Sequence, residues 1–342
     1  METILVTGGL GFVGSHTCVK LLENNYNIVI VDSLINSSRD ILDKIKEIFN
    51  LKGVKVNHKI QFIEGDLRDR FFLENVFNSY SKTDRPIKFV LHFAGLKSIY
   101  ASIKMPIEYW DTNVSSTISL LSIMKKYHCF SLIFSSSASV YQSKGQNLLK
   151  ETDVLKPITP YGKTKLCIEE ILRDLSECEE CWRIANLRFF NPVGSHNSGL
   201  LTESSKNNSS NLFPEIIKTI KGKQKTVLIF GKDWPTCDGT CIRDFIHVMD
   251  LAEAHIATLN YLQNNKPQNI AINIGTGKGT SILEIIKTFR KIQGIKLSYE
   301  FTERRMGDQP FLVADNKRAL QLLDWLPKRE ISEMCSDSVI NL

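Results

Sequence analysis

The sequence predicts an α/β fold in which a doubly wound parallel sheet is followed by a smaller C-terminal α/β domain. Three observations predict it. Short β-branched segments alternate with longer helical segments. A glycine-rich turn joins the first strand to the first helix, and the alternation weakens after Asn191. Strands that alternate with helices form βαβ units, whose parallel sheet is covered by helices on both faces. This arrangement is the Rossmann fold.

The alternation is regular through residues 1–190. Strands are expected at Thr3–Thr7, Ile28–Val31, Gln61–Glu64, Lys88–His92, Ser131–Ser135 and Arg183–Phe189. Helices are expected between them, at about Phe12–Asn24, Arg39–Asn50, Arg70–Ser79, Ile107–Tyr127 and Gly162–Ser176. Residues 1–190 are therefore predicted to form the first domain.

Residues 191–342 form the predicted second domain. A polar segment, Ser204–Asn211, is expected to be an exposed loop. Further elements are expected as helices at Leu212–Lys221, Val248–Leu262 and Ile282–Ile292, and as strands at Val227–Phe230 and Ala271–Ile274. The helix near residues 248–262 is expected to pack back on the first domain.

The composition predicts a soluble, cytoplasmic protein. Of its 342 residues, 42% are hydrophobic and 23% are charged, which is ordinary for a globular chain. No apolar segment reaches the ~20 residues that span a membrane, and no signal-peptide pattern follows Met1. The eight cysteines are scattered and are expected to be free thiols, so no metal site is predicted.

The net charge of +6 favours an anionic partner, but its basic residues are spread along the chain without a run of five or six. This distribution argues against nucleic acid as a partner. It suits a small phosphorylated substrate, which needs fewer positive charges.

A nucleotide-binding turn is predicted at the segment from Val6 to Gly14, which follows the first strand and opens the first helix. Gly8, Gly11 and Gly14 allow a tight turn, so that a pyrophosphate lies over the N–H groups of the helix N-terminus. Asp32 ends the second strand, where its carboxylate can accept both hydroxyls of an adenosine ribose and repel a 2′-phosphate. The pattern favours NAD over NADP.

Two more strand ends are expected at the same edge of the sheet. Asp66 follows the third strand, and Phe93-Ala94-Gly95 follows the fourth. Ligands bind at the carboxyl ends of parallel strands, and Gly95 would let the cofactor pass close to the backbone.

The catalytic candidates are Tyr161 and Lys165, with Ser137 at the end of the fifth strand. Tyr161 and Lys165 are four residues apart and point to one face of a helix. A free tyrosine has a pKa near ~10 and is a poor base at neutral pH. We expect the Lys165 ammonium and a positively charged nicotinamide to lower that pKa, so that Tyr161 accepts a proton from a sugar hydroxyl. Ser137 can hydrogen-bond the same oxygen.

Several motifs together resemble the UDP-glucose 4-epimerase family of extended short-chain dehydrogenases/reductases. They are Thr7-Gly8-Gly9-x-Gly11-x-x-Gly14, His92-Phe93-Ala94-Gly95-Leu96-Lys97, Ser135-Ser136-Ser137-Ala138, Pro160-Tyr161-Gly162-Lys163, Arg188-x-Phe190-Asn191-Pro192 and Arg243-Asp244-x-Ile246-His247. The resemblance implies an isomerase that interconverts UDP-galactose and UDP-glucose through a transient 4-keto sugar with tightly bound NAD. It also implies a homodimer, and assigns residues 1–190 to NAD and residues 191–342 to the UDP-sugar. The candidate dimer surface consists of the helices at about Ile107–Tyr127 and Gly162–Ser176.

The resemblance also implies site residues. Those for NAD are Gly8, Gly11, Phe12, Val13, Gly14, Asp32, Asp66, Leu67, Phe93, Ala94, Gly95, Lys97, Asn113, Ser135, Tyr161, Lys165 and Phe190. Those for the substrate are Lys97, Ser137, Tyr161, Asn191, Asn211, Leu212, Phe230, Arg243, Arg305, Asp308 and Leu312. Arg243 and Arg305 would bind the pyrophosphate and Asp308 the uridine ribose. Bulk at position 312 is associated in the family with exclusion or acceptance of a 2-acetamido group.

Two alternatives remain. One is a related nucleotide-sugar enzyme, such as a 4,6-dehydratase or a uronate epimerase. A dehydratase typically has an Asp-Glu pair after the serine, where this chain has Ala138 and Ser139. The other is a catalytically silent NAD-binding sensor, which could lose Tyr161 or Lys165 without harm, whereas this chain has both.

Overall fold

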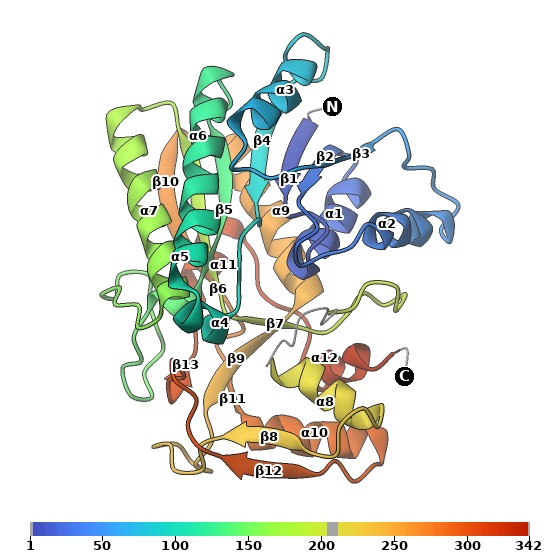
Figure 1. Ribbon diagram of the computed structural model, residues 1–342, viewed down its shortest axis with the longest axis vertical. Coiled ribbons are helices and arrows are strands. Elements are labelled where there is room, and N and C mark those ends of the chain that lie inside the picture. Colours follow the sequence, from blue (N-terminus) through green and yellow to red (C-terminus); the bar gives the residue numbers. More distant parts are fainter. Residues whose placement is uncertain (1–2, 204–210, 341–342) are drawn as a thin grey trace.

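The computed structural model describes residues 3–203 and 211–340, so most of the predicted loop Ser204–Asn211 lies outside the described residues. A parallel sheet of seven strands forms its centre, in the order β10-β6-β5-β4-β1-β2-β3 (Figure 1). The strands are β1 Thr3–Thr7, β2 Asn27–Asp32, β3 Ile60–Glu64, β4 Ile87–His92, β5 Ser131–Ser137, β6 Arg183–Phe189 and β10 Gln268–Ile274. The prediction of a doubly wound α/β fold is confirmed.

Alternating side chains of the buried strands pack into two separate cores. In β1, Ile4 and Val6 belong to one core and Leu5 to the other, as the twofold side-chain period of a strand requires. The first core contains residues of the helices α1 Phe12–Glu23, α2 Asp40–Asn50, α9 Val248–Asn264 and α11 Lys317–Leu323. The second contains residues of α3 Arg70–Ser81, α6 Ser116–Lys126 and α7 Pro160–Cys178. Helices therefore cover both faces.

Two elements from the C-terminal half belong to the large sheet and its covering helices. Helix α9 packs against α1. Strand β10 pairs in parallel with β6 along its whole length. The sequence predicted the strand at Ala271–Ile274 but not its place in this sheet, because register between distant segments leaves no local pattern. The chain thus leaves the large sheet after β6 and returns to it at β10.

The predicted helix at Ile107–Tyr127 is not continuous. After α4 Ile99–Lys104, the chain forms α5 Pro106–Tyr109, a π-helical turn Trp110–Ser115 and α6. Such π turns are often found at functional sites. Here the turn carries the buried Asn113, whose Oδ1 accepts from the Leu96 N–H at 2.7 Å. The irregular turn is therefore tied to the loop after β4.

The smaller region lies below the carboxyl ends of the sheet in Figure 1. One of its sheets contains β7 Asn191–Val193, β9 Ile242–His247, β11 Gly279–Ser281 and β13 Phe311–Leu312. A second pairs β8 Val227–Phe230 with β12 Tyr299–Thr302. The helices α8 Leu212–Ile220, α10 Ile282–Gln293 and α12 Ile331–Ser338 supply its core together with residues of β7, β8 and β9. The prediction missed β7, β9, β11, β12 and β13, which are short or interrupted by charged residues.

No helix in residues 3–203 or 211–340 combines the length and apolar character needed to cross a membrane.

Candidate active site

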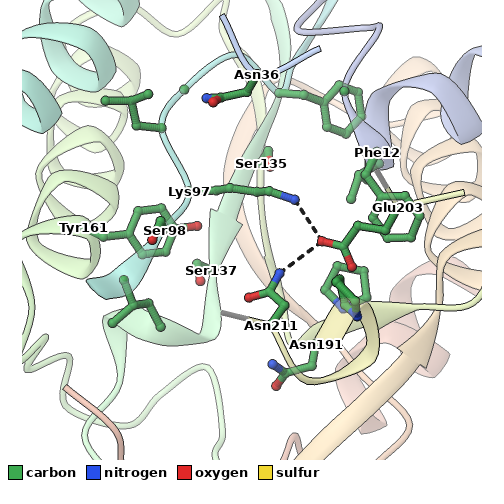
Figure 2. A pocket seen from close by; sticks show the side chains of 18 of the residues that line it. Phe12, Asn36, Lys97, Ser98, Ser135, Ser137, Tyr161, Asn191, Glu203 and Asn211 are labelled. Carbon is green, nitrogen blue, oxygen red and sulfur yellow. Dashed lines mark hydrogen bonds and ion pairs between the residues drawn. The ribbon is translucent and has the colours of Figure 1, made fainter. Parts of the chain in front are cut away.

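One large cavity opens where the carboxyl ends of the sheet face the smaller region (Figure 2). All predicted site residues lie in the described part of the chain, and all except Asn113 line this cavity. Asn113 lies behind the wall, where its Nδ2 donates to Leu96 O and Thr164 Oγ1. It therefore shapes the loop that contains Gly95 instead of facing the cavity.

The turn between β1 and α1 has the shape of a phosphate cradle. Gly8 has a φ of +67°, and a Cβ there would lie 2.6 Å from the backbone nitrogen of Ala94. A Cβ on Gly14 would lie 2.4 Å from the carbonyl oxygen of Gly8. No side chain caps the helix at Gly11, so its first N–H groups are available to an anion. Glycine is required here for geometry, and the cradle fits the pyrophosphate of a dinucleotide.

Asp32 closes the cradle from the end of β2. Its Oδ2 accepts from the Leu10 N–H at 3.0 Å, and its Oδ1 accepts from the Leu34 N–H at 2.9 Å and the Ser37 hydroxyl at 2.7 Å. The carboxylate is thus fixed beside the glycine turn. The segment that follows also lines the cavity, including Asn36, which the sequence analysis did not assign.

The walls beside the cradle come from β3 and β4. Asp66 forms an ion pair with Arg68 that lowers the pKa of its carboxyl. Leu67 is buried, and the ring of Phe93 packs against His255 at 4.9 Å between centroids. Gly95 has a φ of +151°, in a region that side chains rarely adopt. Asp66, Leu67, Phe93 and Gly95 line the cavity at the edge of the sheet.

Tyr161, Lys165 and Ser137 come together on the opposite wall. Thr159 caps the helix that carries Tyr161 and Lys165 by accepting from the Gly162 N–H, and Pro160 occupies its first turn, as is common at helix starts. The Nζ of Lys165 donates to the carbonyl of Ser135 at 2.8 Å. All these side chains lie near the end of β5.

Burial is the largest influence on the pKa values of Tyr161 and Lys165. Burial raises the pKa of Tyr161, and the hydrogen bond with Ser137 only partly opposes this. Burial also lowers the pKa of Lys165 to about 8. The ammonium is bound to Ser135 and lies 5.9 Å from the centre of the Tyr161 ring. In the protein alone, burial therefore outweighs the hydrogen bond with Ser137 in setting the pKa of Tyr161, and the joint effect of Lys165 and a bound nicotinamide stays a prediction.

The far end of the cavity gathers the charged residues of the smaller region. Arg305 donates through Nε and Nη2 to both oxygens of Asp308, at 3.1 and 3.0 Å. Arg243 lies 3.8 Å from the same carboxylate and donates to the Gln309 carbonyl at 2.6 Å. The Arg305 guanidinium also stacks 4.8 Å from the centre of the Phe230 ring. Two guanidinium groups, one carboxylate and an aromatic face suit a nucleoside diphosphate.

Between the two ends, Asn191 and Asn211 reach into the cavity (Figure 2). Glu203, which the sequence analysis missed, accepts from Lys97 at 3.1 Å and from Asn211 at 3.0 Å. This carboxylate links the loop after β4 to the start of α8. Leu212 and Leu312 add apolar surface to the wall, while Phe190 is almost fully buried beside them. Nothing in the local sequence around Glu203 indicated the contact with Lys97, which lies more than 100 positions earlier in the chain.

Within residues 3–203 and 211–340, no three His, Cys, Asp or Glu side chains are placed to hold a metal ion.

A Rossmann sheet with a phosphate cradle, facing a Tyr-x-x-x-Lys helix across one cavity, defines a dinucleotide-dependent enzyme class that acts on a hydroxyl-bearing substrate. The comparison with family models agrees and narrows the class. The chain belongs to the NAD dependent epimerase/dehydratase family, whose model matches residues 4–275.

Full-length relatives are similar to this chain. It is 42% identical to the UDP-glucose 4-epimerase of Bacillus subtilis over 98% of its own length and 95% of that protein. It is 41% identical to UDP-glucose 4-epimerase 2 of Arabidopsis thaliana, again over 98% of this chain and 93% of the relative. The solved UDP-glucose 4-epimerase of Bifidobacterium longum, in complex with NAD+ and UDP, superimposes with a TM-score of 0.92 at 40% identity, covering 99% of this chain and 97% of that one.

Proposed function

We propose that this protein is a UDP-glucose 4-epimerase, which interconverts UDP-galactose and UDP-glucose with tightly bound NAD. One observation carries the proposal: Tyr161, Lys165 and Ser137 face the same cavity as the dinucleotide cradle and the Arg243–Arg305–Asp308 cluster. That cavity therefore offers a cofactor end, a proton acceptor and a nucleoside-diphosphate end. The relatives from Bacillus subtilis and Arabidopsis thaliana, which match nearly the whole chain, support the same activity.

NAD fits the cofactor end. Its pyrophosphate would lie on the cradle of Gly8, Gly11 and Gly14, and its adenosine ribose beside Asp32. Phe12, Val13, Asp66, Leu67, Phe93, Ala94, Lys97 and Ser135 would complete that site. When bound, the nicotinamide supplies reversible hydride transfer at C4 of the sugar.

The residues of this chain would handle the proton. Tyr161 accepts the proton of the sugar 4-hydroxyl and later returns it, so it must alternate between phenolate and phenol. Ser137 can hydrogen-bond the same oxygen and hold it near Tyr161. The Lys165 ammonium and the positive charge of the bound cofactor favour the phenolate, which offsets the effect of burial on the pKa of Tyr161.

The nucleotide would be the fixed part of the substrate. Arg243 and Arg305 bind the pyrophosphate, Asp308 binds the uridine ribose, and Phe230, Asn211 and Leu212 line the uracil end. The sugar has fewer partners, chiefly Asn191, Lys97 and the active-site hydroxyls. Binding at the nucleotide would let the 4-keto sugar turn over and accept hydride on its other face.

The direct test is to incubate the purified protein with UDP-galactose and measure UDP-glucose by chromatography. We expect conversion in both directions toward one equilibrium ratio, without added NAD. Tyr161→Phe is the inactive control. A 4,6-dehydrated product would favour the dehydratase alternative, and no product with NAD bound would favour the silent sensor.

The division of labour and the assembly are further parts of this proposal. Residues 1–190 would bind NAD and residues 191–342 the UDP-sugar, with α9 and β10 returning to the large sheet and its covering helices. A homodimer in the cytoplasm is proposed, with the helices near residues 107–127 and 162–176 at its interface. The exposed apolar side chains of Ile107, Trp110 and Ile118 on that surface support this.

The oligomer can be tested by sedimentation. Ile107 is 78% exposed on the proposed interface, and Phe71, at 76%, is an equally exposed apolar residue on α3, outside it. We expect wild type and Phe71→Glu to sediment as dimers and Ile107→Glu to dissociate. A monomeric wild type would refute the dimer.

A further inference from the structure

The helix that carries the active-site tyrosine bears a third buried polar residue. Tyr161, Lys165 and Glu169 follow at intervals of four on α7, so they share one face of the helix. They are 7%, 4% and 6% exposed. Tyr161 and Lys165 line the cavity, whereas Glu169 does not. Glu169 therefore does not contact the substrate and lies behind Lys165.

Its carboxylate binds two elements of the sheet. Oε1 accepts from the Ser136 hydroxyl at 2.5 Å and from Arg188 Nε at 3.0 Å. Oε2 accepts from Arg188 Nη2 at 2.6 Å. Arg188 in turn donates to the Tyr141 hydroxyl at 2.8 Å, and that hydroxyl donates to Asn273 Oδ1 on β10 at 2.8 Å. Glu169 thus connects α7 to β5, β6 and β10.

The position of Ser136 makes this connection relevant to the active site. Its neighbours on β5 are Ser135, whose carbonyl accepts from the Lys165 ammonium, and Ser137, the predicted partner of the sugar hydroxyl. Helix α7 therefore contacts this strand end twice, through Lys165 on Ser135 and through Glu169 on Ser136. Glu169 thus has a charge near Lys165 and also contacts the strand that carries Ser137.

We propose that Glu169 is a positioning residue: its carboxylate keeps Lys165 in the ammonium form and fixes the end of β5 that presents Ser137. The effect on catalysis rests on the epimerase reaction proposed above, whereas the effect of Glu169 on Lys165 does not. In support, burial lowers the pKa of Lys165 and Glu169 opposes that effect. Without Glu169, we expect Lys165 to become neutral near physiological pH and to lose its effect on Tyr161.

Other charged and titratable groups surround Lys165 and Glu169 in the described part of the chain. Arg188 from β6 faces Glu169, Tyr161 precedes Lys165 on α7, and Tyr141 lies beyond Arg188. His92 from β4 also lies near Lys165, but burial lowers its pKa to about 3, so it stays neutral. Glu151 meets the far side of Arg188 through its backbone carbonyl. Glu169 is the carboxylate whose charge opposes the effect of burial on the pKa of Lys165.

The first experiment needs no activity: thermal unfolding of wild type and Glu169→Gln between pH 6 and 8.5. Above the folded-state pKa of Lys165, the unfolded chain binds more protons than the folded one, so stability rises with pH. The stability of wild type should therefore begin to rise near pH 8. The stability of Glu169→Gln should begin to rise at a lower pH. The difference in Tm between the two should therefore narrow as pH rises from 6 to 8.

Two controls isolate the charge. In a Lys165→Met background the Tm difference caused by Glu169→Gln should not change with pH. Ser136→Ala removes a hydrogen bond to the same carboxylate without changing a charge, so its Tm deficit should also be constant. If Glu169→Gln does not fold because Arg188 is left unpaired, Glu169→Gln/Arg188→Gln replaces it, and we expect a narrowing in the same direction but smaller, because a cation is removed together with the carboxylate. If the Tm difference between wild type and Glu169→Gln, both with Lys165 present, does not change with pH, the proposal is overturned.

The second experiment follows kcat/KM for UDP-galactose against pH. The alkaline limb of Glu169→Gln should move to lower pH by about one unit or more, since a neighbouring opposite charge shifts a pKa by roughly that amount. Ser136→Ala should leave the limb in place. An unmoved limb in Glu169→Gln would overturn the catalytic role. If the protein has no epimerase activity but the Tm difference narrows, the proposed function fails and the role of Glu169 toward Lys165 stands.

Discussion

The two ends of the cavity are built in different ways. The cofactor end consists largely of backbone, in a glycine turn and strand ends that are local in sequence. The substrate end consists of side chains from β9, from the loop before β13 and from the segment around residue 203, which only the tertiary structure brings together. Backbone sites require particular residue spacings, so they leave motifs. Side-chain sites assembled from distant segments leave few.

This difference explains which residues could be predicted. Asp32 was predicted with a mechanism, because a parallel strand places its end beside the glycine turn. Arg305 and Asp308 could be assigned only through the resemblance, since no rule links them to Arg243 more than 60 positions earlier. Glu203 was missed because Lys97, one of its partners, lies in a distant segment, and its contact with Asn211 eight residues later belongs to no known motif.

The fold follows the same division. The strands of the large sheet were predicted to within three residues at each end, because buried parallel strands are continuous apolar runs. Strand β9 was missed because Arg243 and Asp244 interrupt it. Asp244 accepts from the backbone N–H groups of Thr276, Gly277 and Ala314, and burial raises its pKa to about 6. Charged residues in a strand are thus satisfied by contacts that the sequence does not show.

The largest expected effect lies where the two ends meet. Tyr161→Phe should lower turnover of UDP-galactose by about 10² to 10⁴, the usual contribution of a positioned acid or base. The NAD content measured in the denatured extract should not change, because the cofactor end is mostly backbone. A variant with more than half of wild-type turnover would show that Tyr161 is not the proton acceptor.

A smaller effect should separate the substrate end from the cofactor end. Arg243→Gln removes a guanidinium from the pair that faces Asp308, and we expect KM for UDP-galactose to rise about 10- to 100-fold. Bound NAD should be unaffected. Loss of NAD together with the rise in KM would contradict the separation of the two ends.

At the cofactor end, Asp32→Ala should relax the preference for NAD over NADP. The substitution removes the carboxylate that would repel a 2′-phosphate, and we expect about a tenfold change in relative affinity from roughly 1.4 kcal/mol of lost discrimination. The cofactors extracted from wild type and variant are identified by mass spectrometry. Predominant NADP in the wild-type extract would refute the role assigned to Asp32.

The smallest expected effect concerns the width of the sugar site at Leu312. This residue lies on β13, opposite Arg243 of β9, and it packs against the core cluster that contains Tyr141 and Phe190. A packed leucine can move aside only at a cost of about 1 to 3 kcal/mol, so UDP-N-acetylgalactosamine should react more slowly than UDP-galactose without being excluded. Leu312→Ala should raise the rate with the N-acetyl sugar, and Leu312→Tyr should suppress it, while both retain UDP-galactose activity. Because Leu312 acts by bulk alone, KM for UDP-galactose should change far less than in Arg243→Gln. Equal rates for the two sugars in wild type, unchanged in either variant, would show that Leu312 does not control the width of the site.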